Sequence, residues 1–224
     1  MTIESIQRPG WAANFIATAT DSNRQQGLLK CYVDKNVYTR EIDFLQAVSK
    51  TPKVPGTSSN AQSAFAKLYN AYPMADGRHF CTFTELISGD ILWNFAMERG
   101  LEEKDRDLPG LYVEIISAIK YMHGIKWVHG DIQPKNIIIR NNAPKGASRV
   151  SITGFYASQK LNGEVAGLVI PATLGYEPPE DYTDVSKLSF TDFNRKNWMI
   201  GIGEAPKGSS GLSSANQFKR DAWM

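Results

Sequence analysis

The sequence lacks several features that would place it in a specialised class of proteins. It contains only two cysteines among 224 residues, too few for the disulfide framework of a small secreted domain. No apolar run approaches the roughly 18 residues of a membrane span, and the opening segment 1–11 has no signal-peptide character. We therefore expect a soluble protein in the reducing cytoplasm or nucleus, with Cys31 and Cys81 in apolar, strand-like segments.

The sequence also lacks an excess of positive or negative charge. Lys plus Arg is 25 against 23 Asp plus Glu, a formal net charge of +2, and no block of like charges occurs. This balance gives no support to a nucleic-acid or anionic-membrane partner. The hydrophobic fraction is 42%, which is enough for a sizeable core, and the length fits one domain or two small lobes around a cleft.

The order of the apolar patterns predicts an α+β fold. A strand-rich part, residues 1–87, precedes a mainly helical part, residues 88–203, and the Gly/Ser-rich tail 204–224 is expected to be disordered. Glu41, Leu45 and Val48 form one helical stripe. The expected strands are 13–20, 27–33, 64–72 and 79–87, with short β-rich runs at 125–128, 136–140 and 149–155, and the expected helices are 39–50, 91–99, 111–123 and 192–202.

The most informative segment is HGDIQPKN, residues 129–136. It resembles the catalytic loop of the protein kinase family, H-R-D-L-x-x-x-N. The resemblance implies that Asp131 orients and deprotonates the acceptor hydroxyl and that the amide oxygen of Asn136 ligates a magnesium ion on the phosphates. It also implies a two-lobed kinase-like fold, with a small β-rich N-lobe and a mainly helical, truncated C-lobe.

Other segments fall in the order of the same family. Lys30 and Glu41 occupy the places of the strand lysine and its helix partner, which grip the phosphates of ATP. Thr84 lies at the gatekeeper position, and the hinge residues 85–87 would offer backbone groups to adenine. The expected nucleotide-binding residues are therefore Lys30, Thr84, Glu85, Ile87 and Ile138. Downstream, ATLGYEPPE at 172–180 resembles the end of the activation segment, and NWMIGIG at 197–203 resembles the helix that follows it.

Several departures from the family pattern affect phosphate and metal binding. Gly154 stands where the family has the metal-binding Asp of D-F-G, and no Asp or Glu occurs between Ala147 and Gly163. Asn136 alone would hold Mg²⁺ only weakly. The glycine-rich loop keeps only one of its glycines, and we expect Phe15 to crowd the phosphates. Four further positions differ from the family pattern. They are Ala12 in the nucleotide loop, Leu28 in the adenine slot, and Gly130 and Gln133 in the catalytic loop.

Packing positions look better kept than metal positions, because His129, Phe155 and Leu45 fall where the family stacks apolar side chains between the lobes. The resemblance therefore implies a pseudokinase, a binding or regulatory scaffold with weak or no ATP binding. The alternatives are an atypical active Ser/Thr protein kinase, a small-molecule phosphotransferase, suggested by the HGD triplet, and a nonfunctional fragment. Because few residues follow the last expected helix, we also expect a protein partner over the apolar face of 111–123.

Overall fold

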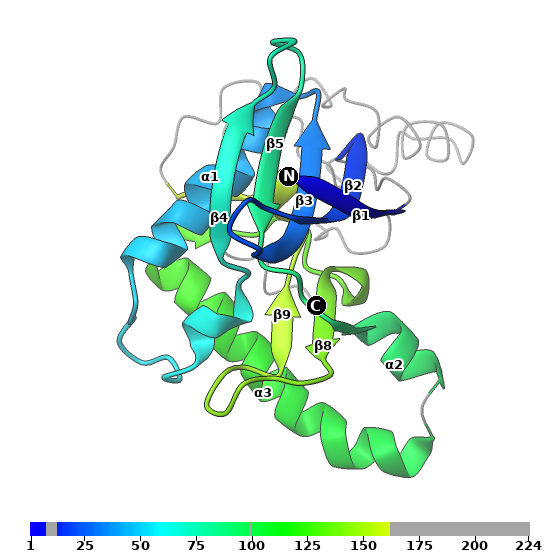
Figure 1. Ribbon diagram of the computed structural model, residues 1–224. Helices are drawn as coiled ribbons and strands as arrows, with labels where there is room; N and C mark the ends of the chain where they lie inside the picture. The colour runs from blue at the N-terminus through cyan, green and yellow to red at the C-terminus, as the bar shows by residue number, and fades with distance from the viewer. Residues whose placement is uncertain (8–12, 99, 162–224) are drawn as a thin grey trace, which may run out of the picture.

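The computed structural model of the chain describes residues 1–7, 13–98 and 100–161 (Figure 1). The N-lobe is built on a five-stranded antiparallel sheet with the strand order β1-β2-β3-β5-β4. The first strand was not expected from the sequence. The strands are β1 (Thr2–Gln7), β2 (Phe15–Thr20), β3 (Gln26–Tyr32), β4 (Leu68–Pro73) and β5 (Phe80–Thr84).

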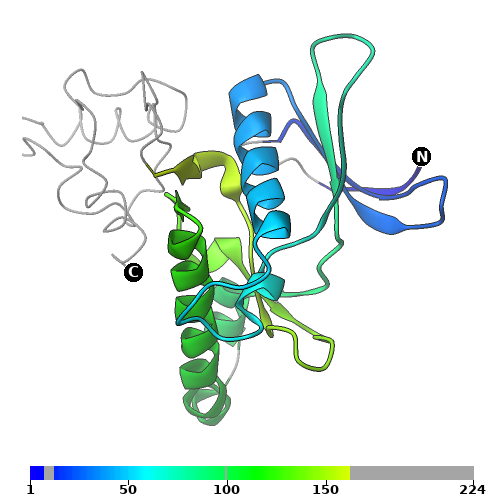
Figure 2. The same cartoon turned by 90° about the vertical axis from the view of Figure 1, so that its left-hand side faces the viewer.

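Helix α1 (Lys35–Lys50) stands against one side of this sheet (Figure 2). It begins four residues earlier than the apolar pattern predicted, because the side chain of Asp34 caps it by accepting a hydrogen bond from the Asn36 N–H at 2.7 Å. The predicted stripe of Glu41, Leu45 and Val48 is buried. A carboxylate is therefore held inside the lobe.

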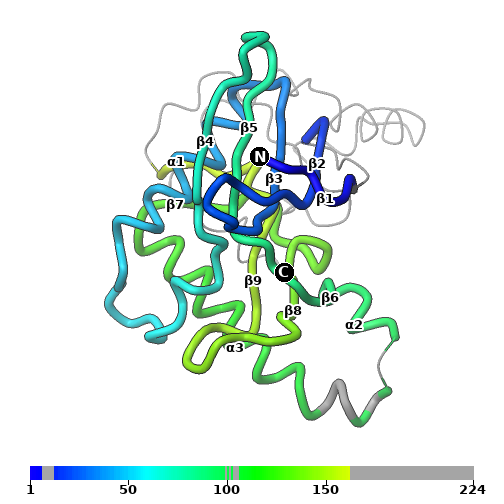
Figure 3. Tube along the Cα trace, viewed as in Figure 1, coloured from blue at the N-terminus to red at the C-terminus, as the bar shows by residue number. Residues whose placement is uncertain are grey.

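After β5 the chain leaves the sheet of the N-lobe and enters the second lobe at β6 (Figure 3). Helix α3 begins ten residues before the predicted start and contains Pro109 in its interior. The elements of this lobe are β6 (Gly89–Ile91), α2 (Leu92–Glu98), α3 (Leu101–Gly124), β7 (Trp127–Val128), the 3₁₀ turn η2 (Pro134–Asn136), β8 (Ile137–Arg140), β9 (Val150–Ile152), η3 (Phe155–Ala157) and β10 (Gln159–Lys160).

The segment between α1 and β4 links the two lobes. It was assigned to the N-lobe from the sequence, but its short helix η1 (Ala61–Ala64) packs on α3 and β9. The Ser151 hydroxyl donates to the Ala64 carbonyl at 3.2 Å, and Arg140 donates to the Ser63 carbonyl at 2.8 Å. The strand expected at 64–72 begins only at Leu68, because Ala64 is the last residue of η1. The contacts of η1 fix the lobes against each other.

One apolar core runs through both lobes. The Phe44 ring of α1 lies 4.5 Å from that of Phe155 and 5.2 Å from that of Phe65, and Leu45 belongs to the same cluster. His129 is fully buried, with its ring 5.4 Å from Phe155. The predicted column of His129, Phe155 and Leu45 is thus present in this shared core, and Phe44 joins it.

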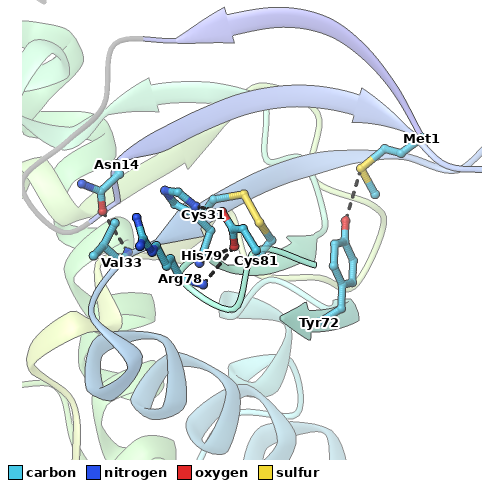
Figure 4. Close-up of a disulfide and its surroundings, with 9 residues drawn as sticks. Met1, Asn14, Cys31, Val33, Tyr72, Arg78, His79 and Cys81 are labelled. Atoms are coloured by element: carbon cyan, nitrogen blue, oxygen red, sulfur yellow. Dashed lines mark hydrogen bonds and ion pairs between the residues drawn. A yellow bond between two sulfur atoms is a disulfide. The ribbon is translucent and has the colours of Figure 1, made fainter. Parts of the chain in front are cut away.

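The two cysteines are paired. Cys31 of β3 and Cys81 of β5 are opposite one another in the sheet and form a disulfide, with a Cα–Cα distance of 4.1 Å (Figure 4). Antiparallel register places directly opposed side chains close together, which brings the two sulfur atoms within bonding distance. The sequence indicated a reducing environment for both cysteines, and the bridge differs from that expectation. A single bridge still does not amount to a disulfide framework.

The predicted apolar face of α3 is divided between core and surface. Ile115 and Met122 are buried, whereas Tyr112 and Ile116 are 52 and 56% exposed. Val113, which was not assigned to this face, is 68% exposed beside them. None of the helices in the described ranges is long and apolar enough to cross a membrane. The expectations for the activation-segment end, the helix 192–202 and the tail 204–224 lie outside the described residues.

Candidate functional site

Lys30 and Glu41 meet between β3 and α1. The Lys30 Nζ lies 2.8 Å from Glu41 Oε1, and Glu41 is only 2% exposed. The Tyr32 hydroxyl donates to the other carboxylate oxygen, and burial together with the Glu41 charge raises the pKa of the Tyr32 phenol. Strand alternation explains the geometry, because Lys30 and Tyr32 share one face of β3. The predicted ion pair is formed, with a second donor that was not foreseen.

The carboxylate of Asp131 is enclosed by donors from its own chain. Its Oδ2 atom accepts from Gln133 Nε2 at 2.8 Å, from Asn136 Nδ2 at 2.7 Å and from the hydroxyl of Tyr156. The backbone N–H of Asp131 donates to His129 Nδ1 at 3.2 Å. Asp131 is 4% exposed. The catalytic-loop residues predicted from the motif therefore come together, with Tyr156 added to them.

Asn136 lies beside Asp131, as the motif predicts. The side-chain nitrogen of Asn136 also donates to the backbone carbonyl of Asp131 at 2.8 Å. The backbone carbonyl of Asn136 accepts from the Thr153 N–H at 2.8 Å. These bonds commit the amide nitrogen to Asp131. The amide oxygen is the atom that remains as a candidate metal ligand.

Gly154 closes the other side of Asn136. Its φ is +82°, and a Cβ at this position would lie 2.8 Å from both Cγ and Oδ1 of Asn136. An L-residue adopts such a backbone only at a cost, so both the conformation and the space favour glycine. The residue that replaces the family's acidic ligand is therefore fitted to this turn.

The donor set around Asn136 does not fit a magnesium ion. Mg²⁺ prefers near-octahedral oxygen ligation that includes one or two carboxylates, and Gly154 brings none. Within the part of the chain that the structure describes, no group of three His, Cys, Asp or Glu side chains could hold a metal. Weak binding of Mg²⁺ at this position stays a prediction from the sequence.

The turn after Gly154 has two functions in the fold. It begins η3, whose first residue, Phe155, is 2% exposed in the core and whose second residue, Tyr156, reaches Asp131. The backbone carbonyl of Tyr156 accepts from Arg40 Nη1 at 2.8 Å, and burial lowers the pKa of the Arg40 guanidinium. Helix α1 therefore holds this turn in place.

Gly130 approaches the same turn from the catalytic loop. Its φ is +82°, and a Cβ would lie 2.7 Å from the Ala157 carbonyl oxygen. A side chain here would be strained and would clash with backbone. The glycine in place of the family's arginine is thus required by the close approach of η3.

The expected hinge residues lie at the end of β5. Thr84 is 2% exposed and pairs with Leu28 of β3. The Glu85 N–H donates to the Lys67 carbonyl at 2.8 Å, and the Glu85 carboxylate pairs with Arg140 at 3.2 Å. Ile87 is half-buried, and Ile138, also half-buried, lies on β8 opposite Ile91. A nucleotide role for these residues stays a prediction.

The expectation that Phe15 crowds the phosphates is wrong. Phe15 lies opposite Cys31 in the β2–β3 pair. It packs against a second buried cluster, formed by Ala19, Leu29, Cys31, Cys81 and Phe83. Because successive side chains of a strand alternate between faces, this is the face opposite to Lys30. Leu28, two residues before Lys30, is half-buried on the Lys30 face, as expected. Gly10 and Ala12 of the glycine-rich loop lie outside the described residues.

Comparison with known proteins agrees with this geometry. The sequence matches the protein kinase domain over residues 17–194. The chain belongs to the protein kinase family. Relatives include the Dictyostelium discoideum myosin light chain kinase A, 27% identical over 53% of this chain, the human calcium/calmodulin-dependent protein kinase type 1B, 29% over 46%, and the Bacillus subtilis serine/threonine-protein kinase YabT, 27% over 58%. The matched segment spans 38, 29 and 36% of these relatives' own lengths.

Three side chains of this kinase domain were missed as site residues. Tyr156 and Gln133 donate to Asp131, and Arg40 holds the backbone of Tyr156. The sequence identified Gln133 only as the residue that replaces the family's catalytic-loop lysine. A signal for Tyr156 was present in the sequence, because a bulky aromatic stands where the family's D-F-G triplet ends in glycine. Nothing in the sequence marks Arg40, whose contact depends on how α1 docks.

Proposed function

We propose that this kinase domain is a pseudokinase, a binding or regulatory scaffold that transfers phosphate slowly or not at all. The observation that carries the proposal is Gly154, a residue with no ligand atom, packed against the amide of Asn136. The acidic metal ligand is absent, and the turn leaves little room for a substitute. Loss of one preorganised charge contact costs ~3–4 kcal/mol in the transition state, a rate loss of roughly 10²–10³.

Nucleotide binding is proposed to be weak. The Lys30–Glu41 pair supplies one cation toward the phosphates, with the Lys30 side chain 17% exposed. Gln133 in place of the family's lysine removes a second cation, and its amide donates to Asp131 instead. Without a bridging metal, the phosphates of ATP would depend on few charge contacts.

Thermal unfolding with ATP tests the binding part of the proposal. Ligand at 100 times its dissociation constant stabilises the folded state by ~2.7 kcal/mol. We expect a small or absent rise in Tm with millimolar ATP, unchanged by Mg²⁺ or Mn²⁺. Lys30→Met serves as the control, since any ATP-dependent rise should disappear in that variant. A metal-dependent rise of several degrees would contradict the proposal.

Phosphate incorporation into a generic protein substrate tests the catalytic part. We expect incorporation at the background level of Asp131→Asn. Metal-dependent transfer that is lost in both Asp131→Asn and Lys30→Met would instead establish an atypical active Ser/Thr kinase. That second candidate is favoured by one observation, the intact Lys30–Glu41 pair at 2.8 Å.

We also propose that a protein partner covers the exposed part of α3. Tyr112, Val113 and Ile116 are contiguous on the helix surface and each is more than half exposed. A photoreactive residue at position 113 should give a discrete cross-linked product in cells, and the same residue at Lys53, which is exposed on a loop, should not. Equal products from both positions would contradict a specific surface.

A further inference from the structure

The hydroxyl of Tyr156 reaches the carboxylate that the family uses to receive the proton of the acceptor. It donates to Asp131 Oδ2, the atom that also accepts from Gln133 and Asn136. In active kinases the substrate hydroxyl donates to this carboxylate. We propose that Tyr156 is a built-in occupant of the acceptor position and excludes an external hydroxyl from Asp131. The inference rests on the proposed function. It adds a second obstacle to phosphate transfer, besides the missing metal ligand at Gly154.

Three separate contacts fix Tyr156 in this place. The left-handed turn at Gly154 begins η3 and directs the following residues. Arg40 of α1 donates to the Tyr156 carbonyl at 2.8 Å. Gly130 lets the next residue, Ala157, come so close that a Cβ on the glycine would lie 2.7 Å from its carbonyl oxygen. The backbone of Tyr156 is thus held from the turn, the helix and the catalytic loop at once.

The carboxylate has little capacity for a further donor at this atom. A carboxylate oxygen offers about two lone-pair sites, and three donors already converge on Oδ2. Asp131 is also only 4% exposed. An incoming hydroxyl would therefore have to displace Tyr156 before it could reach Oδ2.

Tyrosine nitration tests the contact without requiring activity. Tetranitromethane attacks the phenolate, and a neighbouring carboxylate disfavours that ionised form. Tyr112, which is 52% exposed, is the internal standard, and Tyr121, which is 1% exposed, reports global folding. Peptide mapping should show Tyr156 nitrated about tenfold or more slowly than Tyr112, and Asp131→Ala should remove most of that protection while Tyr121 stays unmodified.

Nitration of Tyr156 as fast as Tyr112 in the unaltered chain would overturn the proposal, whatever the catalytic outcome. Unchanged protection in Asp131→Ala would overturn it as well. If Tyr121 becomes reactive in that variant, Asp131→Asn replaces it, because the isosteric amide preserves shape and removes the charge. Faster nitration of Tyr156 with Tyr121 still protected would support the contact.

Phosphate transfer separates this inference from the proposed function. If the unaltered chain does transfer phosphate, the pseudokinase proposal fails, and Tyr156→Gly should then raise the rate toward an external hydroxyl several-fold. Tyr156→Phe, which removes only the hydroxyl, should raise it less. An unchanged or lower rate in Tyr156→Gly, with Tm retained, would overturn the inference. If no variant transfers phosphate, the nitration result decides.

Discussion

Substitution of Gly154 measures how closely the fold depends on the residue that replaced the acidic ligand. Gly154→Ala forces an L-residue into φ +82° and places a Cβ 2.8 Å from the Asn136 side chain. The left-handed backbone costs about 1–2 kcal/mol, and overpacking typically adds about 1–3 kcal/mol. The expected loss in the free energy of unfolding is therefore roughly 2–5 kcal/mol.

The chain provides a matched control at Gly146. This glycine has the same φ of +82°, but nothing lies within 4 Å of its potential Cβ. Gly146→Ala should therefore show the backbone cost alone, ~1–2 kcal/mol. Urea unfolding of both variants isolates the steric part as the difference between them. Equal losses in the two variants would refute the close packing of Gly154 on Asn136.

Gly154→Asp extends the test to metal binding. The new carboxylate would approach the Oδ1 region of Asn136 in the same strained turn, so we expect it to be at least as destabilising as alanine. Mg²⁺ at millimolar concentration should restore little of the loss, because the backbone and steric costs of the turn remain when an ion binds. A rise of more than about 2 kcal/mol on adding Mg²⁺, the linkage expected for a well-occupied site, would show that the turn does accommodate a metal site.

The remaining predictions concern the N-lobe and the core. Lys30→Met should destabilise the fold by roughly 2–4 kcal/mol, because it leaves the Glu41 carboxylate buried beside fewer donors, and a urea double-mutant cycle with Glu41→Gln should show a combined loss below the sum. A dithiol reductant should lower the free energy of unfolding by ~2–4 kcal/mol, since the Cys31–Cys81 bridge closes a separation of 50 residues, and the double Cys→Ala variant should not respond to it. Burial raises the pKa of Tyr121 to about 12. The stabilisation from its neutral phenol should therefore be intact below pH 10 and should be lost as the pH rises from 10 toward 12. The free energy of unfolding of Tyr121→Phe, measured in urea, should fall less across this window.

The sequence was most informative where local periodicity and motif order coincide. The Lys30–Glu41 pair could be predicted because the order of the segments resembles the protein kinase family, whereas the helical stripe alone indicated only that Glu41 could face inward; the structure forms the pair. The neighbourhood of Asp131 and Asn136 could be predicted because a short loop fixes their spacing. In each case the relevant geometry is local or depends on one well-defined docking.

Failures occurred where pairing register or tertiary docking decides the outcome. Phe15 was aligned with a glycine of the phosphate loop, but its pairing with Cys31 turns it to the other face of the sheet. The start of α3 was hidden by Pro109 and by polar residues that show no apolar stripe. The disulfide depends on which strands become neighbours, and β3 and β5 are not adjacent in sequence.

The contacts of Asp131 give this residue a structural role in the fold. In the family, charges flank the aspartate on both sides, an arginine before it and a metal-binding carboxylate beyond it. This chain has glycine at both positions, Gly130 and Gly154, and both allow close backbone approach. Neutral donors surround the buried carboxylate instead, and its removal would take away one hydrogen bond each from Tyr156, Gln133 and Asn136. A hydrogen bond of this kind typically contributes about 0.5–1.5 kcal/mol, so these contacts give Asp131 a structural role in addition to any part in phosphoryl transfer.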